Sequence, residues 1–212
     1  MTKKDRVTAS IPTQIKNAAL VDKRRVQIVD AAVKLFIANG FHKTTTREIA
    51  RRSGISIGLL YEYVNSKEDI LFLVCDAIHT EVENGVTEAL GSKASGRDSL
   101  AAMIRKYFMI CDRMSDHILL IYQETRSLPP HWQHNVLKKE IKITDIFIDA
   151  LANLARNGGI PEMDPRSMTL MAHNIVVLGH MWTFRRWEIQ KEFGIEEYIR
   201  RQTDFIIGAI SG

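Results

Sequence analysis

Basic side chains gather near one end of the chain, where they could bind a polyanion. Residues 1–67 hold thirteen Lys and Arg against five Asp and Glu, a net charge of +8, whereas the remainder carries a net charge of −4. Guanidinium and ammonium groups pair with phosphates, so this asymmetry is expected where only one end of a protein meets a polyphosphate. A tail of solvated lysines would explain the cations before residue 7. It does not explain a second group, which comprises Arg47, Arg51, Arg52 and Lys67.

That second group lies in or beside residues 40–69, whose pattern predicts two short helices around a tight turn. The first helix would span 46–53, with Thr45 as its N-cap and Glu48 three residues later, as a capping box requires. Gly54 supplies the positive φ of a sharp turn, and Ser56 caps a second helix over 57–63. Such a pair is a helix-turn-helix, whose second helix enters the DNA major groove. The segment therefore predicts a DNA-binding protein.

The remaining elements that must position this pair are also predicted to be helices. An apolar stripe predicts a helix over 24–39, ended by Gly40 as its C′ residue. Ser66 would cap a long helix that runs towards Leu90. Further helices are predicted at about 98–114, 116–127, 130–156, 165–190 and 195–210, separated by Pro and Gly residues. We therefore expect an all-α protein of about nine helices: a flexible basic arm (1–22), a helix-turn-helix domain (23–66) and a larger helical domain for ligand binding and dimerisation (67–212).

Composition narrows the class of protein. A chain of 212 residues with 45% hydrophobic and 25% charged residues can form a substantial core. No apolar run approaches the ~20 residues that cross a membrane, and the polar N-terminus is no secretory signal, so we expect a cytoplasmic protein without a membrane partner.

Cys75 and Cys111 are expected to be reduced and packed. His131 and His134 have metal-chelating spacing but no further ligand nearby, so neither a metal nor a cofactor is expected.

Residues 24–71 resemble the DNA-binding domain of the TetR family of bacterial repressors. The resemblance rests on one run of spaced positions, namely Gly40-Phe41, Thr44-Thr45, Arg47, Ile49-Ala50, Gly54-Ile55-Ser56, Gly58, Leu60-Tyr61, Tyr63-Val64 and Ser66-Lys67-Glu68. Val64 departs from the family pattern, in which an aromatic residue is commoner.

The resemblance implies which residues meet DNA. An arginine at position 47 can fork onto guanine or grip a phosphate, and the phenols can donate to phosphate oxygens. Lys67 would share a phosphate with the positive end of the next helix. Leu59 could contact a thymine methyl group, and the alternative is that it packs inside the group of three N-terminal helices. The implied DNA-binding residues are Thr45, Thr46, Arg47, Ser56, Gly58, Leu59, Tyr61, Tyr63 and Lys67.

The resemblance further implies a homodimer through the last two long helices and a small-molecule effector. Apolar residues cover a wide arc of both helices, and a helix that is apolar on two faces needs two partners. Gly179 would let a partner helix approach closely. An effector pocket that is mainly apolar with a few polar groups is expected among the middle helices. Its candidate residues are Met103, Tyr107, Cys111, Tyr122, Phe147, Met171, Trp182 and Arg186, although most residues of these types are simply core.

A second, weaker resemblance concerns the ligand. Residues 181–187, followed by 194–197, are similar to a Trp-x-x-basic-Trp segment of TetR-family regulators that sense acyl-CoA thioesters. Indoles can stack on adenine, and Arg185 or Arg186 can meet phosphates. The arginines are spaced differently here, and a Trp–Arg cluster at the rim of the dimer bundle is the alternative interpretation.

The predicted function is a ligand-responsive transcriptional regulator, most simply a dimeric repressor that an apolar or acyl-CoA-type ligand releases from a palindromic operator. Two alternatives belong to other classes. A ligand-independent architectural DNA-binding protein would show little sequence preference. An enzyme on a helical scaffold lacks any nucleophile–base pair or metal set of recognisable spacing.

Overall fold

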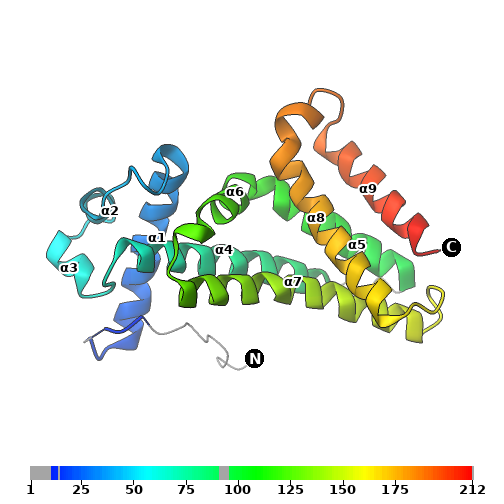
Figure 1. Ribbon diagram of the computed structural model, residues 1–212, viewed down its shortest axis with the longest axis horizontal. Helices are drawn as coiled ribbons and strands as arrows, with labels where there is room; N and C mark the ends of the chain where they lie inside the picture. The colour runs from blue at the N-terminus through cyan, green and yellow to red at the C-terminus, as the bar shows by residue number, and fades with distance from the viewer. Residues whose placement is uncertain (1–10, 14, 91–95, 212) are drawn as a thin grey trace. The chain divides into compact units, whose positions relative to one another are not determined.

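The computed structural model describes residues 11–13, 15–90 and 96–211, and among them it contains nine α-helices and one short 3₁₀ helix (Figure 1). The elements are α1 (Ala18–Asn39), α2 (Thr46–Arg52), α3 (Ile57–Tyr61), α4 (Lys67–Leu90), α5 (Gly96–Arg113), α6 (Ser115–Glu124), η1 (Thr125–Ser127), α7 (Pro130–Arg156), α8 (Pro165–Ile189) and α9 (Ile195–Ala209). The all-α prediction is confirmed.

Local capping chemistry starts α2 and α3 where they were predicted, although α3 ends at Tyr61 rather than at residue 63 and α6 ends at Glu124 rather than at residue 127. The Thr45 hydroxyl accepts from the Glu48 N–H while the Glu48 carboxylate accepts from the Thr45 N–H, which completes the capping box of α2. Ser56 caps α3 through the Leu59 N–H. Gly54 has a φ of 72°, in the left-handed region that the turn between α2 and α3 needs.

The N-terminal boundary differs from the prediction. Helix α1 begins at Ala18 rather than near Arg24, because the Asn17 side chain accepts from the Leu20 N–H and caps it. Ile11 is 2% exposed, so the chain is packed before the helix starts. The predicted flexible arm therefore does not extend to residue 22, and its first ten residues lie outside the described part of the chain.

The chain forms two compact units, which are described separately. The first, here called the head, comprises residues up to Ala77 together with Leu120–Leu137. The second, here called the body, comprises Ile78–Leu119 and Lys138–Gly212. This division differs from the predicted boundary at residues 66 and 67. The start of α4, the end of α6, η1 and the start of α7 all pack with the helix-turn-helix rather than with the body.

Within the body, α5 packs against both α8 and α9. The contact with α8 is closest at Gly179, where an added Cβ would lie 2.7 Å from Tyr107 Cε1 and 3.0 Å from Cys111 Sγ. A helix does approach closely at Gly179, as expected, and that helix is α5 of the same chain. No described helix is long and apolar enough to cross a membrane.

Both cysteines are buried, and they do not form a disulfide. Burial raises the pKa of the Cys75 thiol to about 12, with a smaller contribution from Asp76. Burial also raises the pKa of Cys111 to about 12, although the Tyr107 hydroxyl acts in the opposite direction. The predicted reduced and packed thiols are consistent with this burial.

We predict that both thiols are inert in the folded protein, since thiolate is the reactive form and burial disfavours it. A colorimetric thiol reagent at neutral pH should label neither residue within minutes, and both once a denaturant is added. Single Cys→Ser variants assign each signal. Rapid labelling of a thiol in the native protein would contradict the burial described here.

Candidate nucleic-acid interface and effector site

The two short helices α2 and α3 form a rigid pair in the head. Ile49 and Leu60 are fully buried, so each helix contributes one side chain to a shared core. The Ile55 N–H donates to the Ala50 carbonyl across the turn at 3.0 Å. At the outer surface, the hydroxyls of Thr46 and Tyr61 are 3.1 Å apart and join the start of α2 to the end of α3. The relative orientation of the two helices is therefore fixed at both ends.

The predicted DNA-contacting residues lie largely on the exposed side of this pair. Exposed residues are Thr45, Arg47, Ser56, Gly58 and Tyr61, whereas Thr46 and Leu59 are half-buried. An added Cβ on Gly58 would meet no atom within 4 Å, so internal packing does not require glycine there. A bare backbone at an exposed helical position suits close approach to another molecule.

Lys67 is held inside the head rather than extended into solvent. Its ammonium group donates to the carbonyls of Phe41, His42 and Thr44, at 3.0, 3.3 and 3.1 Å. It also lies 4.4 Å from the centroid of the Phe41 ring, as in a cation–π contact. All three ammonium hydrogens have acceptors, so a phosphate contact by Lys67 would have to replace one of them.

Tyr63 departs from its predicted position. It is only 2% exposed and belongs to the core of the head, so little of the residue is available for a phosphate. Its carbonyl accepts from Arg25 Nη2 at 3.1 Å, and the same guanidinium donates to the Ile11 carbonyl at 2.7 Å. Burial lowers the pKa of Arg25, with Asp22 and Asp69 acting in the opposite direction. Sequence reasoning missed Arg25, which lies mid-helix with no distinguishing neighbours.

The predicted effector residues do not come together in one cavity. Tyr107, Cys111 and Phe147 are fully buried in the body, with Tyr107 and Phe147 rings in edge contact at 5.4 Å between centroids. Tyr122 lies in the head, where it is 43% exposed. The half-buried Met171 lines neither of the two hollows described below. The remaining three, Met103, Trp182 and Arg186, divide between those hollows.

A buried polar pair lies inside the body. The Tyr107 hydroxyl is 2.9 Å from His180 Nε2 and 3.3 Å from the Val176 carbonyl. Burial, with a smaller contribution from the nearby His79, lowers the pKa of His180 to about 4. The imidazole is therefore neutral near pH 7 and serves as a fixed hydrogen-bond partner rather than as a cation.

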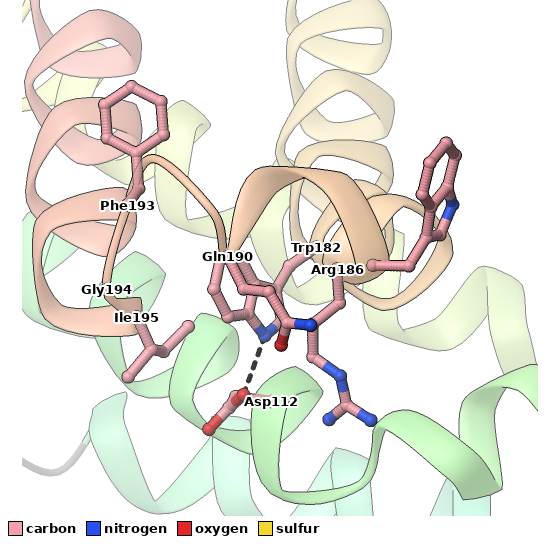
Figure 2. Close-up of a pocket in the computed structure, with 8 residues that line it drawn as sticks. Asp112, Trp182, Arg186, Gln190, Phe193, Gly194 and Ile195 are labelled. Carbon is pink, nitrogen blue, oxygen red and sulfur yellow. Dashed lines mark hydrogen bonds between the residues drawn. The ribbon is translucent and has the colours of Figure 1, made fainter.

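The first hollow lies between the end of α8, the start of α9 and α5 (Figure 2). It is open to solvent, with a volume of about 520 Å³. Trp182 Nε1 donates to Asp112 Oδ1 at 2.7 Å across its floor, and Arg186 extends beside them (Figure 2). Arg186 Nη2 is 3.7 Å from Asp116. The other lining residues are Trp187, Gln190, Phe193, Gly194 and Ile195.

Cations surround the exposed indole of Trp187, which is 61% accessible. The Arg185 guanidinium carbon lies 5.3 Å from the ring centroid, and Lys191 Nζ lies 5.8 Å from it. The resemblance to acyl-CoA-sensing proteins pointed to Trp187 and Arg185 but not to Lys191, which lies outside the matching segments. Both cations lie over the ring, so a planar base could stack on the indole only by displacing one of them, and the displaced charge would then be available to its phosphates.

The second hollow, of about 430 Å³, lies between the start of α5 and the end of α7. Its apolar walls are Leu100, Met103, Ala150 and Leu154, and its polar edge includes Ser99, Asn153 and Asn157. Sequence reasoning identified only Met103 there, because the other residues are leucines of ordinary core type or small and polar residues that carry no distinguishing pattern. Among the described residues, no group of three or more His, Cys, Asp or Glu side chains is placed to hold a metal ion.

Two domain families match this chain. The model of bacterial regulatory proteins of the tetR family matches residues 28–74, which contain α2 and α3. A tetracyclin repressor-like C-terminal domain matches residues 93–186.

Individual relatives agree with these matches. The HTH-type transcriptional regulator HbdR of Aromatoleum sp. (strain CIB) is 29% identical over 190 residues, 90% of this chain and 82% of that protein. The fatty acid metabolism regulator protein of Bacillus subtilis (strain 168) is 33% identical over 96 residues, 45% of this chain and 48% of that one. The crystal structure of AibR in complex with isovaleryl coenzyme A and operator DNA is similar in fold, with a TM-score of 0.69 and 20% identity over 86% of this chain and 97% of AibR.

The exposed glycine of α3 gives a test of the DNA-facing surface. Gly58→Ala should keep or raise the thermal unfolding midpoint, since alanine favours a helix by about 0.8–1.0 kcal/mol and the new Cβ has open space. The same methyl group should weaken binding to cognate DNA by obstructing its approach. Fluorescence anisotropy with a labelled duplex measures the binding, and calorimetry measures the unfolding.

Arg47→Ala is the matched comparison, because it removes an exposed cation from α2. It should cost about 1–3 kcal/mol of binding to the same duplex. Full affinity in Gly58→Ala would show that α3 does not approach DNA closely at this residue.

Proposed function

Since the chain belongs to the TetR family of DNA-binding transcriptional regulators, we propose that it is a homodimeric repressor released from its operator by a small apolar or acyl-CoA-type ligand. Membership of this family makes the protein a regulator rather than an enzyme. The observation that carries the proposal is the rigid α2–α3 pair, with Arg47 and Gly58 on its exposed side, joined to a body that has hollows of ligand size.

The last two helices support a dimer. Leu170 and Val177 of α8 are 63% and 55% exposed, and Phe205 of α9 is 67% exposed. The opposite side of α8 is buried, so α8 is apolar on two sides, only one of which its own chain covers, and Phe205 adds an exposed ring on α9. A twofold partner would cover the second side and would present two recognition helices to a palindromic site.

The first hollow supports an acyl-CoA-type effector. Its Trp187 face and the neighbouring Arg185 and Lys191 suit the adenine and phosphates of coenzyme A, and its volume lies within the range of small-molecule sites. A relative of similar fold was crystallised with isovaleryl coenzyme A and operator DNA, and another relative is a fatty acid metabolism regulator. The ligand would act by preferring a body conformation that disfavours DNA binding.

The dimer is tested at Phe205. Phe205→Glu should weaken self-association, because each subunit loses the burial of one phenyl ring, which contributes about 1.5–3 kcal/mol. The glutamate carboxylate adds a further cost, since the interface would bury its charge. Sedimentation equilibrium or native mass spectrometry over a dilution series gives the dissociation constant. Met109→Glu, at an exposed apolar position of α5, is the matched control and should dimerise normally. A Phe205→Glu protein that dimerises as tightly as the wild type would refute this interface.

The effector is tested by native mass spectrometry and by DNA binding. Isovaleryl-CoA, coenzyme A and a free fatty acid should be compared, each titrated into protein bound to a duplex that the wild type has selected from a random pool. We expect an acyl-CoA to bind once per subunit and to lower DNA affinity, and Trp187→Ala to need more of it. If the protein selects a duplex but none of the three compounds changes its affinity for that duplex, the protein is still a DNA-binding regulator, and acyl-CoA-type effectors are excluded. Failure to select any duplex would refute the operator-binding repressor itself.

A further inference from the structure

The segment Leu120–Leu137 is packed in the head, although in sequence it lies more than forty residues beyond the helix-turn-helix. It is tied to the connection between α1 and α2 by polar contacts. His42 Nε2 lies 3.7 Å from the Glu124 carboxylate and 3.3 Å from the Ser127 hydroxyl. His42 is exposed, so these contacts are weak on their own.

A much more buried contact lies at Trp132. Its indole stacks on the Phe72 ring of α4, with 3.9 Å between the centroids and 12° between the planes. Its Nε1–H donates to Asp69 Oδ1 at 3.1 Å. Trp132 is 8% exposed and Asp69 is 9% exposed. A buried carboxylate is costly unless its oxygens accept hydrogen bonds, so the indole donor is needed for Asp69 to remain there.

The second carboxylate oxygen of Asp69 binds the loop that follows α3, the helix proposed to enter the DNA major groove and here called the recognition helix. Asp69 Oδ2 accepts from the Asn65 N–H at 3.0 Å, and the Asp69 N–H donates to the Ser66 hydroxyl at 3.0 Å. Asn65 lies four residues after the end of α3. One carboxylate therefore connects the start of α7 with the segment that leads out of the recognition helix.

The same loop is held at a second point by Arg25. Its guanidinium donates to the Tyr63 carbonyl, and the Asp69 carboxylate favours its charged form. The Thr13 hydroxyl donates to the neighbouring Glu62 carbonyl at 2.8 Å. Because the Asp69 carboxylate contacts Asn65 and also stabilises the charge on Arg25, loss of Asp69 would loosen the contacts at both Asn65 and Tyr63. The loop that sets the direction of α3 would then move, while the internal hydrogen bonds of α3 would remain.

We propose that Asp69 and Trp132 are positioning residues for operator recognition, through which the start of α7 holds the recognition helix in its DNA-reading orientation. Neither residue lies among the predicted DNA contacts, and each acts through the other. The proposal rests on the operator binding proposed above.

The test uses two conservative variants in the full-length protein. Trp132→Phe keeps an aromatic ring against Phe72 but removes the indole N–H. Asp69→Asn keeps the shape but can accept at only one oxygen, so either Asn65 or Trp132 loses its acceptor. Affinities are measured for the duplex selected by the wild type and for a scrambled duplex of the same composition, and unfolding midpoints are recorded in parallel.

Each variant should lose about tenfold in affinity for the selected duplex, because DNA binding must then restore an orientation of α3 that the broken hydrogen bond no longer holds. Affinity for the scrambled duplex should change little, because phosphate contacts dominate it. The double variant should lose about as much as either single variant, since both break one hydrogen-bonded unit. His134→Ala, at an exposed position two residues along α7, should behave as wild type.

A lower unfolding midpoint with an unchanged ratio of the two affinities would overturn the proposal and leave Trp132 and Asp69 a purely structural role. Additive losses in the double variant would likewise show that the residues do not act through each other. If the wild type selects no duplex, the operator-binding function fails instead, which distinguishes the two failures.

Discussion

The close approach of α8 to α5 at Gly179 is the constraint on which the body depends. With no side chain at this position, Tyr107, Phe108 and Cys111 of α5 pack directly against the α8 backbone. That contact brings the Tyr107 hydroxyl to His180 and buries both. It also fixes which side of α8 its own chain covers, and so leaves Leu170 and Val177 exposed on the other.

The two hollows use different stretches of α5. Asp112 lines the first hollow and Met103 lines the second, and both belong to α5. Tyr107 lies between them in sequence and is held by Gly179 and His180.

Sequence reasoning succeeded where local chemistry decides the structure. Thr45, Ser56 and Gly54 set the ends of α2 and α3 through hydrogen bonds and a backbone conformation that involve only nearby residues. It failed where distant segments decide burial. Nothing near Tyr63 or Lys67 in sequence reveals that one is buried and that the other is held by carbonyls more than twenty residues earlier. The predicted effector residues were divided between separate places for the same reason, because periodicity identifies an apolar face but not the element that covers it.

The neutral histidine in the body has a consequence for acid tolerance. In the folded chain, the imidazole of His180 takes up its second ring proton, and so becomes charged, only below about pH 4. An unfolded histidine takes up this proton near pH 6.5. Between these values the unfolded chain binds the additional proton, so acid favours unfolding by up to about 1.4 kcal/mol per pH unit for this group. Stability from His180 is complete above that interval and is lost as the pH falls through it. Because the folded body keeps the imidazole that is hydrogen-bonded to Tyr107 neutral, the free energy of unfolding of the body decreases as the solution becomes acidic.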